Sequence, residues 1–336
     1  VCSSDLPTQA VFSYFMPLIA WLLWALASRG LAGSYRPMNS IPQTPQILCI
    51  GSVLWDIIGR APVHMRQGSD VAGRITRLPG GVALNIAMTL ARFGLMPSLL
   101  SAVGRDAEGK ELVAACTELG LNCDYLYRSA DLPTDVYMAV EGANGLISAI
   151  ADAHSLEMAD EKILAALKDG RLGTVDMPFS GVIALDGNLT TSLLGKLAKS
   201  ALFAAADLRI APASPGKAQR LLALLDHPAA TIYVNREEAG LICQSEFDDS
   251  ASAAKALVAK GAARVLVTDG AENSAVAFGD MLLTQKPPQV MVTRVTGAGD
   301  TFMAAHIAAE VSGADNEDAL TAALTAAANY VSGRVE

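Results

Sequence analysis

The chain has 336 residues, of which 51% are hydrophobic and 18% are charged, enough to bury the core of one large α/β domain. Its net charge of −9 argues against a nucleic-acid-binding surface, because there is no basic field to replace counterions. Small molecules are therefore the expected ligands. The five cysteines are scattered without a C-x-x-C pair, which predicts reduced thiols in a cytoplasmic protein, with no disulfide and no zinc site.

The first 37 residues differ in character from the rest of the chain. An apolar run over residues 10–27 is long enough to cross a bilayer, and two arginines follow it, as in a signal anchor. However, no positive residue precedes the run and Pro17 interrupts it. We therefore expect a start at Met38, with residues 1–37 a non-native or unstructured leader. A membrane anchor is the alternative.

Between residues 46 and 334, short apolar runs alternate with helical patterns. Strands are expected at 47–51, within 60–78, and at 99–103, 182–185, 207–211, 231–234, 264–268, 275–278 and 289–292. Helices are expected at 84–93, 109–119, 160–169, 191–204, 215–225 and 250–260, with two more after residue 300. Residues 136–140 and 146–151 flank turn residues and predict an inserted hairpin. The alternation predicts an α/β protein with a mostly parallel sheet and helices on both faces.

A glycine-rich turn near the carboxyl end is the clearest chemical signal. Gly297-Ala298-Gly299-Asp300 runs directly into an alanine-rich helical stretch. The small residues let backbone N–H groups approach an anion, and the positive end of the helix dipole adds to the attraction. Asp300 beside a phosphoryl group would accept a proton from an attacking hydroxyl. The alternative is a plain turn with Asp300 as the helix cap.

Three further segments admit both a structural and a functional interpretation. Gly80 and Gly81 precede a helix with Asn85 in its first turn, which fits either a tight turn or close backbone approach to a hydroxylated ligand. Asn235 and Glu238 fit either an N-cap with its partner or, beside a phosphate, a magnesium-water shell. The turn at residues 268–270 follows a strand at the same expected sheet edge, and taken alone it favours a plain turn.

Other chemistries find little support in the sequence. The segment from Gly104 to Lys110 approaches a P-loop, but Glu111 stands where a Mg²⁺-binding hydroxyl is needed. No G-x-G-x-x-G follows the first strand, which argues against a dinucleotide site. The four histidines are widely spaced, so neither a zinc protease motif nor a hydrolase triad can be assembled.

The order of these segments, from Asp56 through Gly80 to Asp300, resembles the phosphofructokinase-B or ribokinase family of sugar and nucleoside kinases over about residues 46–334. The resemblance implies a three-layer α/β/α fold with a small β lid from about 60–79 and 134–152. It also implies that ATP with Mg²⁺ donates a phosphoryl group to a substrate hydroxyl. Lid strands often pair across a dimer in this family, so a homodimer is possible by resemblance.

The resemblance also assigns roles to individual residues. The catalytic base would be Asp300, and the anion hole would comprise Gly297, Ala298 and Gly299. The substrate-binding residues would be Asp56, Gly80, Gly81, Asn85, Tyr137, Asp152 and Asn188. The residues that bind ATP and magnesium would be Asn235, Glu238, Thr268 and Gly270, with Mg²⁺ held by Glu238 through water.

Within the family, segments 79–87, 133–139, 148–152 and 295–300 resemble the pseudouridine kinases, which implies pseudouridine 5′-phosphate as the product. A kinase for another sugar or nucleoside is the alternative, as is a non-catalytic nucleoside-binding regulator on the same fold. One departure is Arg294-Val295, which stands where many relatives carry Asp-Thr beside a monovalent-cation site. An arginine supplies positive charge itself, so potassium dependence is doubtful.

Overall fold

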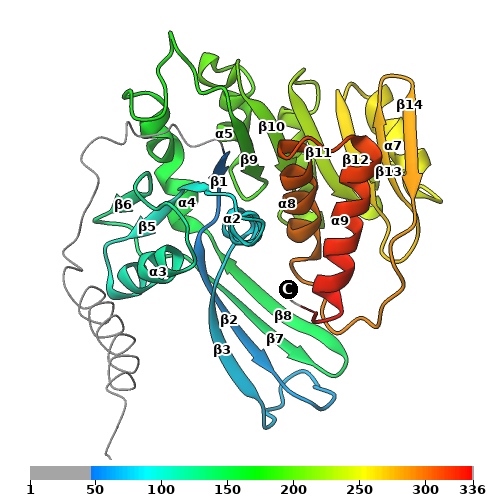
Figure 1. Ribbon diagram of the computed structural model, residues 1–336. Coiled ribbons are helices and arrows are strands. Elements are labelled where there is room, and N and C mark those ends of the chain that lie inside the picture. Colours follow the sequence, from blue (N-terminus) through cyan, green and yellow to red (C-terminus); the bar gives the residue numbers. More distant parts are fainter. Residues whose placement is uncertain (1–46, 335–336) are drawn as a thin grey trace, which may run out of the picture. The chain divides into compact units, whose positions relative to one another are not determined.

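The computed structural model describes residues 47–334, so the expectations on the leader, the membrane anchor and Met38 lie outside the described residues. An eight-stranded sheet forms the centre of the described part (Figure 1). Its strands in spatial order are β14 (Met281–Gln285), β13 (Ser274–Phe278), β12 (Arg264–Thr268), β11 (Ala230–Asn235), β10 (Asp207–Ala211), β9 (Val182–Asp186), β1 (Ile47–Ile50) and β4 (Ser98–Leu100). The six strands from β12 to β4 are parallel, whereas β13 and β14 pair antiparallel at one edge.

Two apolar cores lie on the two faces of this sheet, which gives three layers. In β1, Leu48 and Ile50 belong to one core, while Ile47 and Cys49 belong to the other, as the alternation of a strand requires. The first core is closed by α4 (His154–Ala159), η1 (Asp160–Leu167), α5 (Thr191–Leu197), η2 (Ala201–Phe203), η3 (Pro215–Ala223), α6 (Arg236–Cys243) and α7 (Ser250–Ala259). The second is closed by α2 (Val82–Arg92), α3 (Ala107–Glu118), α8 (Ala298–Val311) and α9 (Asn316–Val331). The expectation of a mostly parallel sheet with helices on both faces is confirmed.

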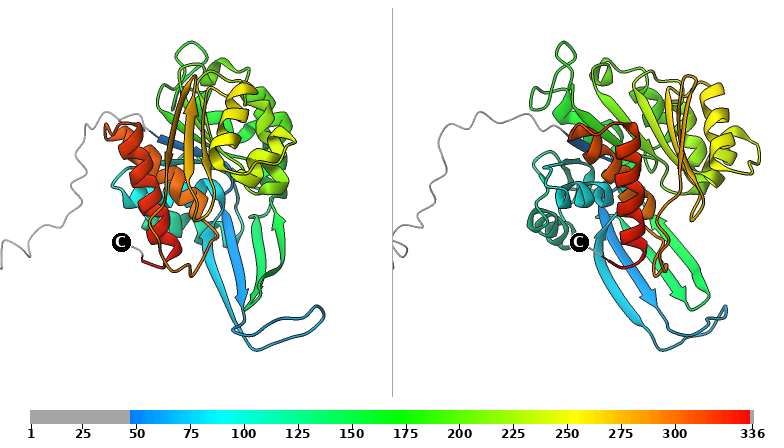
Figure 2. Two further views of the ribbon diagram at one scale, coloured as in Figure 1. Left: turned by 90° about the vertical axis from the view of Figure 1, so that its right-hand side faces the viewer. Right: turned by 45° about the vertical axis from the view of Figure 1, so that its right-hand side comes forward.

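A separate four-stranded sheet extends away from the central one (Figures 1 and 2). Its strands in spatial order are β3 (Arg74–Gly80), β2 (Leu54–Arg60), β7 (Val136–Gly142) and β8 (Gly145–Asp152). The hairpin β7–β8 was expected from its turn residues, but β2 was not predicted as a strand. A two-stranded sheet of β5 (Ala102–Gly104) and β6 (Tyr127–Ser129) completes the described strands.

Several expected elements differ from those observed. The strand expected at 289–292 is wrong, because β14 instead follows β13 after the two-residue turn Gly279-Asp280, with Phe278 paired to Met281. The run 99–103 divides between β4 and β5, which belong to different sheets. The helices expected at 160–169 and 215–225 are 3₁₀ segments for most of their length. No helix within residues 47–334 is long and apolar enough to cross a bilayer.

Candidate active site

Polar residues, among them the predicted Asn235 and Thr268, stand where the parallel strands of the central sheet end. Ser52 follows β1, Asp186 ends β9, Asn235 ends β11 and Thr268 ends β12. Because these strands are parallel, their carboxyl ends meet at one edge of the sheet, which is where open α/β sheets bind ligands. The first turns of α2 and α8 meet at this edge, because the Val82 N–H donates to Ser52 and the Asn85 side chain donates to Asp300.

The turn before α8 depends on glycine for two reasons. Gly297 has φ 89°, a left-handed conformation that other residues rarely adopt, and a Cβ at this position would lie 2.5 Å from the Tyr330 hydroxyl of α9. Thr301 stabilises the first turn of α8. Its backbone N–H and its hydroxyl both donate to the Gly297 carbonyl, at 3.0 and 2.9 Å. Ala298 and Gly299 are the first residues of the helix. Asp300 lies in its first turn without capping it, because no side chain caps α8.

Asp300 is paired with Asn85 of α2. The Asn85 amide donates to Asp300 Oδ2 over 2.8 Å, so the other carboxylate oxygen is available to a ligand. Burial raises the pKa of Asp300 to about 7, and the nearby charges of Asp186 and Asp56 add to the effect, whereas the hydrogen bond from Asn85 opposes it. The site therefore holds a carboxyl group that gains and loses a proton near neutral pH.

Asp56 and the double glycine lie in direct contact. Asp56 is on β2, and burial raises its pKa to about 6. A Cβ at Gly80 would lie only 2.1 Å from Asp56 Oδ2, so the carboxylate rests against the Gly80 backbone. Gly81 caps α2 with φ 100°, and a Cβ there would lie 2.5 Å from the Ser52 carbonyl. Gly80 therefore makes room for the Asp56 carboxylate, and Gly81 for the Ser52 backbone.

The four-stranded sheet places two of the predicted substrate-binding residues, Tyr137 and Asp152, on opposite faces. Asp56 pairs with Tyr137 and Tyr137 with Ala151, so these three side chains share one face. Burial raises the pKa of the Tyr137 hydroxyl, and the Asp56 charge contributes to that rise. Asp152 pairs with Val136, one position along, and therefore lies on the opposite face. The structure brings Tyr137 and Asp56 together but not Asp152.

A polar network around Asp186 was not anticipated as a unit. Asp186 is fully buried and accepts hydrogen bonds from the backbone N–H and hydroxyl of Ser52. Asn188 donates to the same carboxylate from its backbone N–H at 2.7 Å and from its side chain at 3.2 Å. Lys217 then donates to the Asn188 side-chain oxygen. The sequence signal was a carboxylate and an amide two residues apart after a buried strand, but Lys217 had no such signal.

The amide and carboxylate after β11 form a capping box. Glu238 N–H donates to Asn235 Oδ1 at 2.8 Å, and Asn235 N–H donates to Glu238 Oε2 at 2.9 Å. Burial raises the pKa of Glu238 to about 7, and the Glu238 charge in turn helps to raise the pKa of Asp300. Asn235 is the direct neighbour of Thr268 in the sheet, and Gly270 adopts φ 56° in the following turn.

These residues fit a magnesium ion that keeps most of its waters. Within the described residues, no group of three or more His, Cys, Asp or Glu side chains could hold a metal ion. Glu238 nevertheless has one carboxylate oxygen outside the capping box. A single carboxylate with waters and substrate phosphates is the usual environment of Mg²⁺ in kinases.

Arg294 joins the glycine-rich turn to α9. Its Nε donates to the Tyr330 carbonyl at 2.8 Å, and its guanidinium lies 3.8 Å from the centre of the Tyr330 ring. The Tyr330 hydroxyl donates in turn to the Thr296 carbonyl at 2.8 Å. Arginine and tyrosine therefore hold the segment that leads to Gly297.

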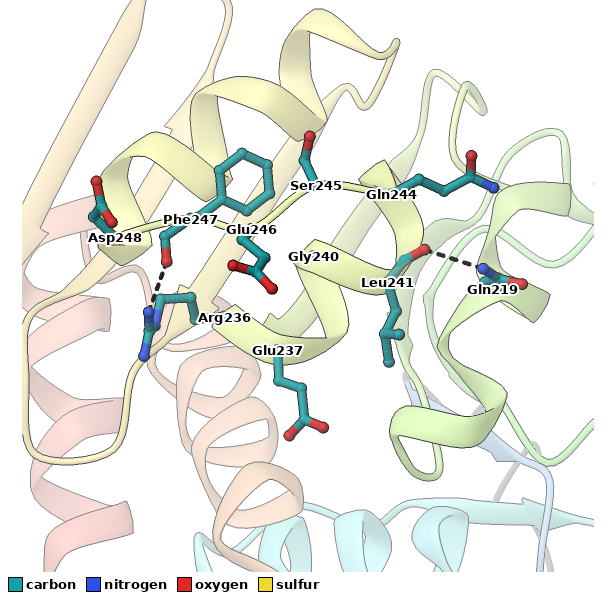
Figure 3. A pocket seen from close by; sticks show the side chains of 10 residues that line it. All are labelled: Gln219, Arg236, Glu237, Gly240, Leu241, Gln244, Ser245, Glu246, Phe247 and Asp248. Atoms are coloured by element: carbon teal, nitrogen blue, oxygen red, sulfur yellow. Dashed lines mark hydrogen bonds between the residues drawn. The ribbon is translucent and has the colours of Figure 1, made fainter.

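A cavity of about 740 Å³ lies against α6 and the loop that follows it (Figure 3). Arg236 spans part of it, donating to the Phe247 carbonyl at 2.6 Å and to Asp269 at 2.9 Å. Gln219 of η3 borders it and donates to the Leu241 carbonyl at 3.2 Å. None of the predicted site residues lines this cavity, although Arg236 directly follows Asn235.

The fold and the site define a ribokinase-like α/β protein of the phosphotransferase class, with an alcohol group as acceptor. The family model described as pfkB family carbohydrate kinase matches residues 44–334. The chain belongs to the pfkB family of carbohydrate kinases.

The relatives of this chain carry the names of different kinases. The chain is 31% identical to the uncharacterized sugar kinase YeiI of Escherichia coli over 154 residues, which cover 45% of this chain and 41% of that protein. It is 27% identical to the pseudouridine kinase of the same species, covering 80% of this chain and 84% of that one. It is 26% identical to the ribokinase of Bacillus subtilis, and the match covers 84% of this chain and 91% of that protein.

Solved structures agree on the fold. A putative sugar kinase from Clostridium perfringens superposes with a TM-score of 0.71 at 25% identity, covering 86% of this chain and 90% of that one. Arabidopsis thaliana ribokinase, solved with ribose and ATP, superposes with a TM-score of 0.69 at 24% identity, with 86% and 93% covered.

Proposed function

We propose that this chain is an ATP-dependent kinase for the 5′-hydroxyl of a ribose-containing substrate, with pseudouridine converted to pseudouridine 5′-phosphate. The observation that carries the proposal is the hydrogen bond between Asn85 and Asp300 at the amino end of α8. It holds one oxygen of a carboxyl group whose pKa is raised to about 7 and leaves the other oxygen available. Pseudouridine kinases from Escherichia coli and Arabidopsis thaliana among the relatives support this choice of acceptor.

In the proposed reaction, the free oxygen of Asp300 accepts the proton of the 5′-hydroxyl. The substrate oxygen then forms a bond to the γ-phosphorus of ATP, the bond to the bridging oxygen breaks, and ADP leaves. Backbone N–H groups of Gly297 and Gly299 would hold the phosphoryl oxygens at the positive end of α8, whereas the Ala298 N–H donates to the Val295 carbonyl at 3.0 Å and would have to exchange that bond to join them. A base with a pKa near the working pH is suited to this proton transfer.

The two substrates would bind at opposite halves of the sheet edge. Asp56, Gly80, Gly81, Asn85 and Asn188 lie toward β1 and β9 and would bind the ribose, with Tyr137 facing the base. Asn235, Glu238, Thr268 and Gly270 lie toward β11 and β12 and would bind ATP. Glu238 would hold Mg²⁺ through water, and the ion would neutralise phosphate charge. Asp152, on the other face of its sheet, is left out of the proposed pocket.

We further infer that the four-stranded sheet is a lid that also joins two copies of the chain. Its face away from Asp56 exposes 61% of Ile150 and 45% of Met138, which pair directly, and 79% of Ile75, which pairs with Gly59 of β2 on the same face. A second copy would cover this face. Ile150→Asp should then lower the mass measured by sedimentation, and an unchanged mass would contradict the dimer.

Cytoplasmic localisation is part of the same proposal. Cys49, Cys116, Cys123 and Cys243 are free thiols, which suits a reducing compartment.

The test is an ADP-release assay with ATP, Mg²⁺ and a panel of pseudouridine, uridine, adenosine and ribose. Wild-type protein should turn over pseudouridine with the highest kcat/KM, and Asp300→Asn should lose several orders of magnitude in kcat while still binding the acceptor. The relatives named nucleoside kinase and ribokinase make another nucleoside or ribose the second candidate. Nucleoside binding without turnover of any acceptor would instead favour a non-catalytic regulator, and full activity of Asp300→Asn would refute the role of Asp300.

A further inference from the structure

Lys217 lies between the two halves of the candidate site. It belongs to the first turn of η3, the segment that follows β10. In the sheet, β10 is flanked by β9, which carries Asp186, and by β11, which carries Asn235. Lys217 is half-buried, and no part of the proposed reaction assigns it a role.

The hydrogen bonds around Lys217 have only one consistent direction. An ammonium group can only donate, so the oxygen of the Asn188 amide must face Lys217. The amide nitrogen of Asn188 is thereby turned toward Ser52 Oγ at 3.1 Å and Asp186 Oδ2 at 3.2 Å. Ser52 Oγ also accepts from the Val82 N–H at 2.9 Å, so its own proton is directed to Asp186.

This network ends at the beginning of α2. Ser52 holds that helix twice, since its hydroxyl accepts from Val82 N–H and its carbonyl accepts from Leu84 N–H at 3.3 Å. The next residue of the helix is Asn85, whose side chain holds Asp300. If the Asn188 amide were rotated by 180°, its oxygen would face the lone pairs of Asp186. Ser52 Oγ would then lose the hydrogen bond that it accepts from the Asn188 amide nitrogen.

We propose that Lys217 is a positioning residue of the kinase, whose ammonium locks the Asn188 amide so that Ser52 fixes the start of α2. The catalytic consequence rests on the proposed function, because it acts through Asn85 and Asp300. The orientation itself does not, because it follows from donors and acceptors alone. Lys217 is thus assigned to acceptor binding rather than to ATP binding.

The charges around Lys217 allow its role to be separated from loop folding. Asp186 and Glu157 are the nearby anions, and Arg220 is the nearby cation. Arg220 donates to the carbonyls of Asn188 and Leu189 at 2.9 and 3.2 Å, so it holds the backbone of the loop. Removing Lys217 therefore leaves the loop anchored and frees only the amide of Asn188.

Four substitutions of Lys217 differ in their capacity to donate a hydrogen bond, and we expect their effects on the acceptor KM to follow that capacity. Lys217→Arg keeps a donor-only group and should stay within a few-fold of wild type. Lys217→Gln can donate or accept and should be intermediate, whereas Lys217→Met and Lys217→Glu should raise the acceptor KM by about 10- to 100-fold with little change in the ATP KM. Lys255→Met, at an exposed position of α7, is the matched control and should behave as wild type.

A second measurement does not require activity. Hydrogen exchange at the Val82 amide should accelerate in Lys217→Met and Lys217→Glu but not in Lys217→Arg or in the control. Asn188→Ala should produce the same acceleration, and adding Lys217→Met to it should have no further effect. The inference would be overturned if exchange at the Val82 amide were unchanged in Lys217→Met. It would also be overturned if Lys217→Arg raised the acceptor KM as much as Lys217→Glu does. Wild-type protein that phosphorylates no acceptor would refute the proposed function alone, because the exchange result would still decide the role of Lys217.

Discussion

The side-chain amide of Asn85 donates to Asp300 Oδ2 over 2.8 Å and joins two helices whose residues are 215 positions apart. Asn85 belongs to the first turn of α2 and Asp300 to the first turn of α8, so both lie at positive helix ends. This hydrogen bond lowers the pKa of Asp300, but burial raises it by more, so the pKa stays above its ordinary value. The pair therefore sets the pH at which the proposed base is ionised.

Activity should accordingly depend on pH through Asp300. Its pKa of about 7 means that kcat should rise with pH through that value, because only the ionised carboxylate accepts a proton. Asn85→Ala removes a bond that favours the ionised form, so the rise should move to higher pH, and activity at neutral pH should fall, by up to roughly tenfold if the midpoint moves by about one pH unit. Asn273→Ala, at an exposed turn, is the control. A profile that does not move in Asn85→Ala would exclude this coupling.

Asp300 should also reduce the stability of the folded protein. Its pKa is raised from 3.8 to about 7 on folding, so the native state binds more protons than the unfolded state between these values. Stability from this group is greatest below the lower value and is lost as pH rises through the folded pKa. Asp300→Asn should therefore raise the Tm above pH 7 and have a smaller effect near pH 4. Calorimetry at both pH values measures this, and an equal change in Tm at both would count against it.

Gly80 should tolerate no side chain. A Cβ there would lie 2.1 Å from Asp56 Oδ2, so Gly80→Ala must displace the carboxylate that faces the proposed ribose site. We expect at least tenfold weaker acceptor binding with an unchanged ATP KM, measured by initial rates. Gly195→Ala in α5 is the matched control, because no atom lies within 4 Å of a Cβ at that position. The control should be neutral or slightly stabilising, since alanine favours a helix over glycine.

The sequence predicted the central sheet well because its strands are continuous apolar runs that end in glycine or polar residues. It missed β2, where Asp56 and the charged end Arg60 interrupt an apolar pattern and pairing with β3 and β7 decides the structure. The strand expected at 289–292 failed because the turn Gly279-Asp280 closes a hairpin earlier. Local sequence patterns do not predict which distant segments pair as strands.

In the candidate site, too, local sequence patterns predicted some residues, while others depend on contacts between distant segments. Gly297 and the pair Gly80-Gly81 could be predicted as candidates because glycine before a helix indicates close approach of other atoms, and Asp300 because it directly follows such a turn. Lys217 and Tyr330 were missed, because a single lysine or tyrosine in a helical segment resembles many others. Their contacts, to Asn188 and to the Thr296 carbonyl, exist only once the chain is folded.

The clamp formed by Arg294 and Tyr330 should make turnover independent of potassium. Arg294 lies 3.8 Å from the Tyr330 ring centre and carries its own positive charge beside the glycine-rich turn. Wild-type rates should be the same in potassium chloride and in choline chloride at equal ionic strength. Tyr330→Phe keeps the ring but loses the bond to the Thr296 carbonyl, so the ATP KM should rise several-fold. A rate that requires potassium would contradict the role of Arg294.

Glu238 should affect magnesium dependence separately from helix capping. Its carboxylate accepts from Asn235 N–H, and glutamine at this position of a capping box can accept the same bond. Glu238→Gln should therefore fold with a nearly unchanged Tm while losing the charge proposed to hold Mg²⁺. We expect the magnesium concentration for half-maximal rate to rise about tenfold or more, because one carboxylate supplies the protein's share of the site.

The adjacent Glu237 provides the control for that experiment. It lies on the same turn of α6 but is exposed, so Glu237→Gln removes the same charge without touching the capping box. The Glu237 charge adds to the rise of the Glu238 pKa, so its removal favours the ionised form of Glu238, and the magnesium titration should stay near that of wild type without shifting to higher concentration. If the titration changes equally in both variants, the effect comes from general electrostatics and not from a site at Glu238. If it changes in neither while Glu238→Ala lowers the Tm, Glu238 serves only to cap α6, because alanine also removes the capping bond.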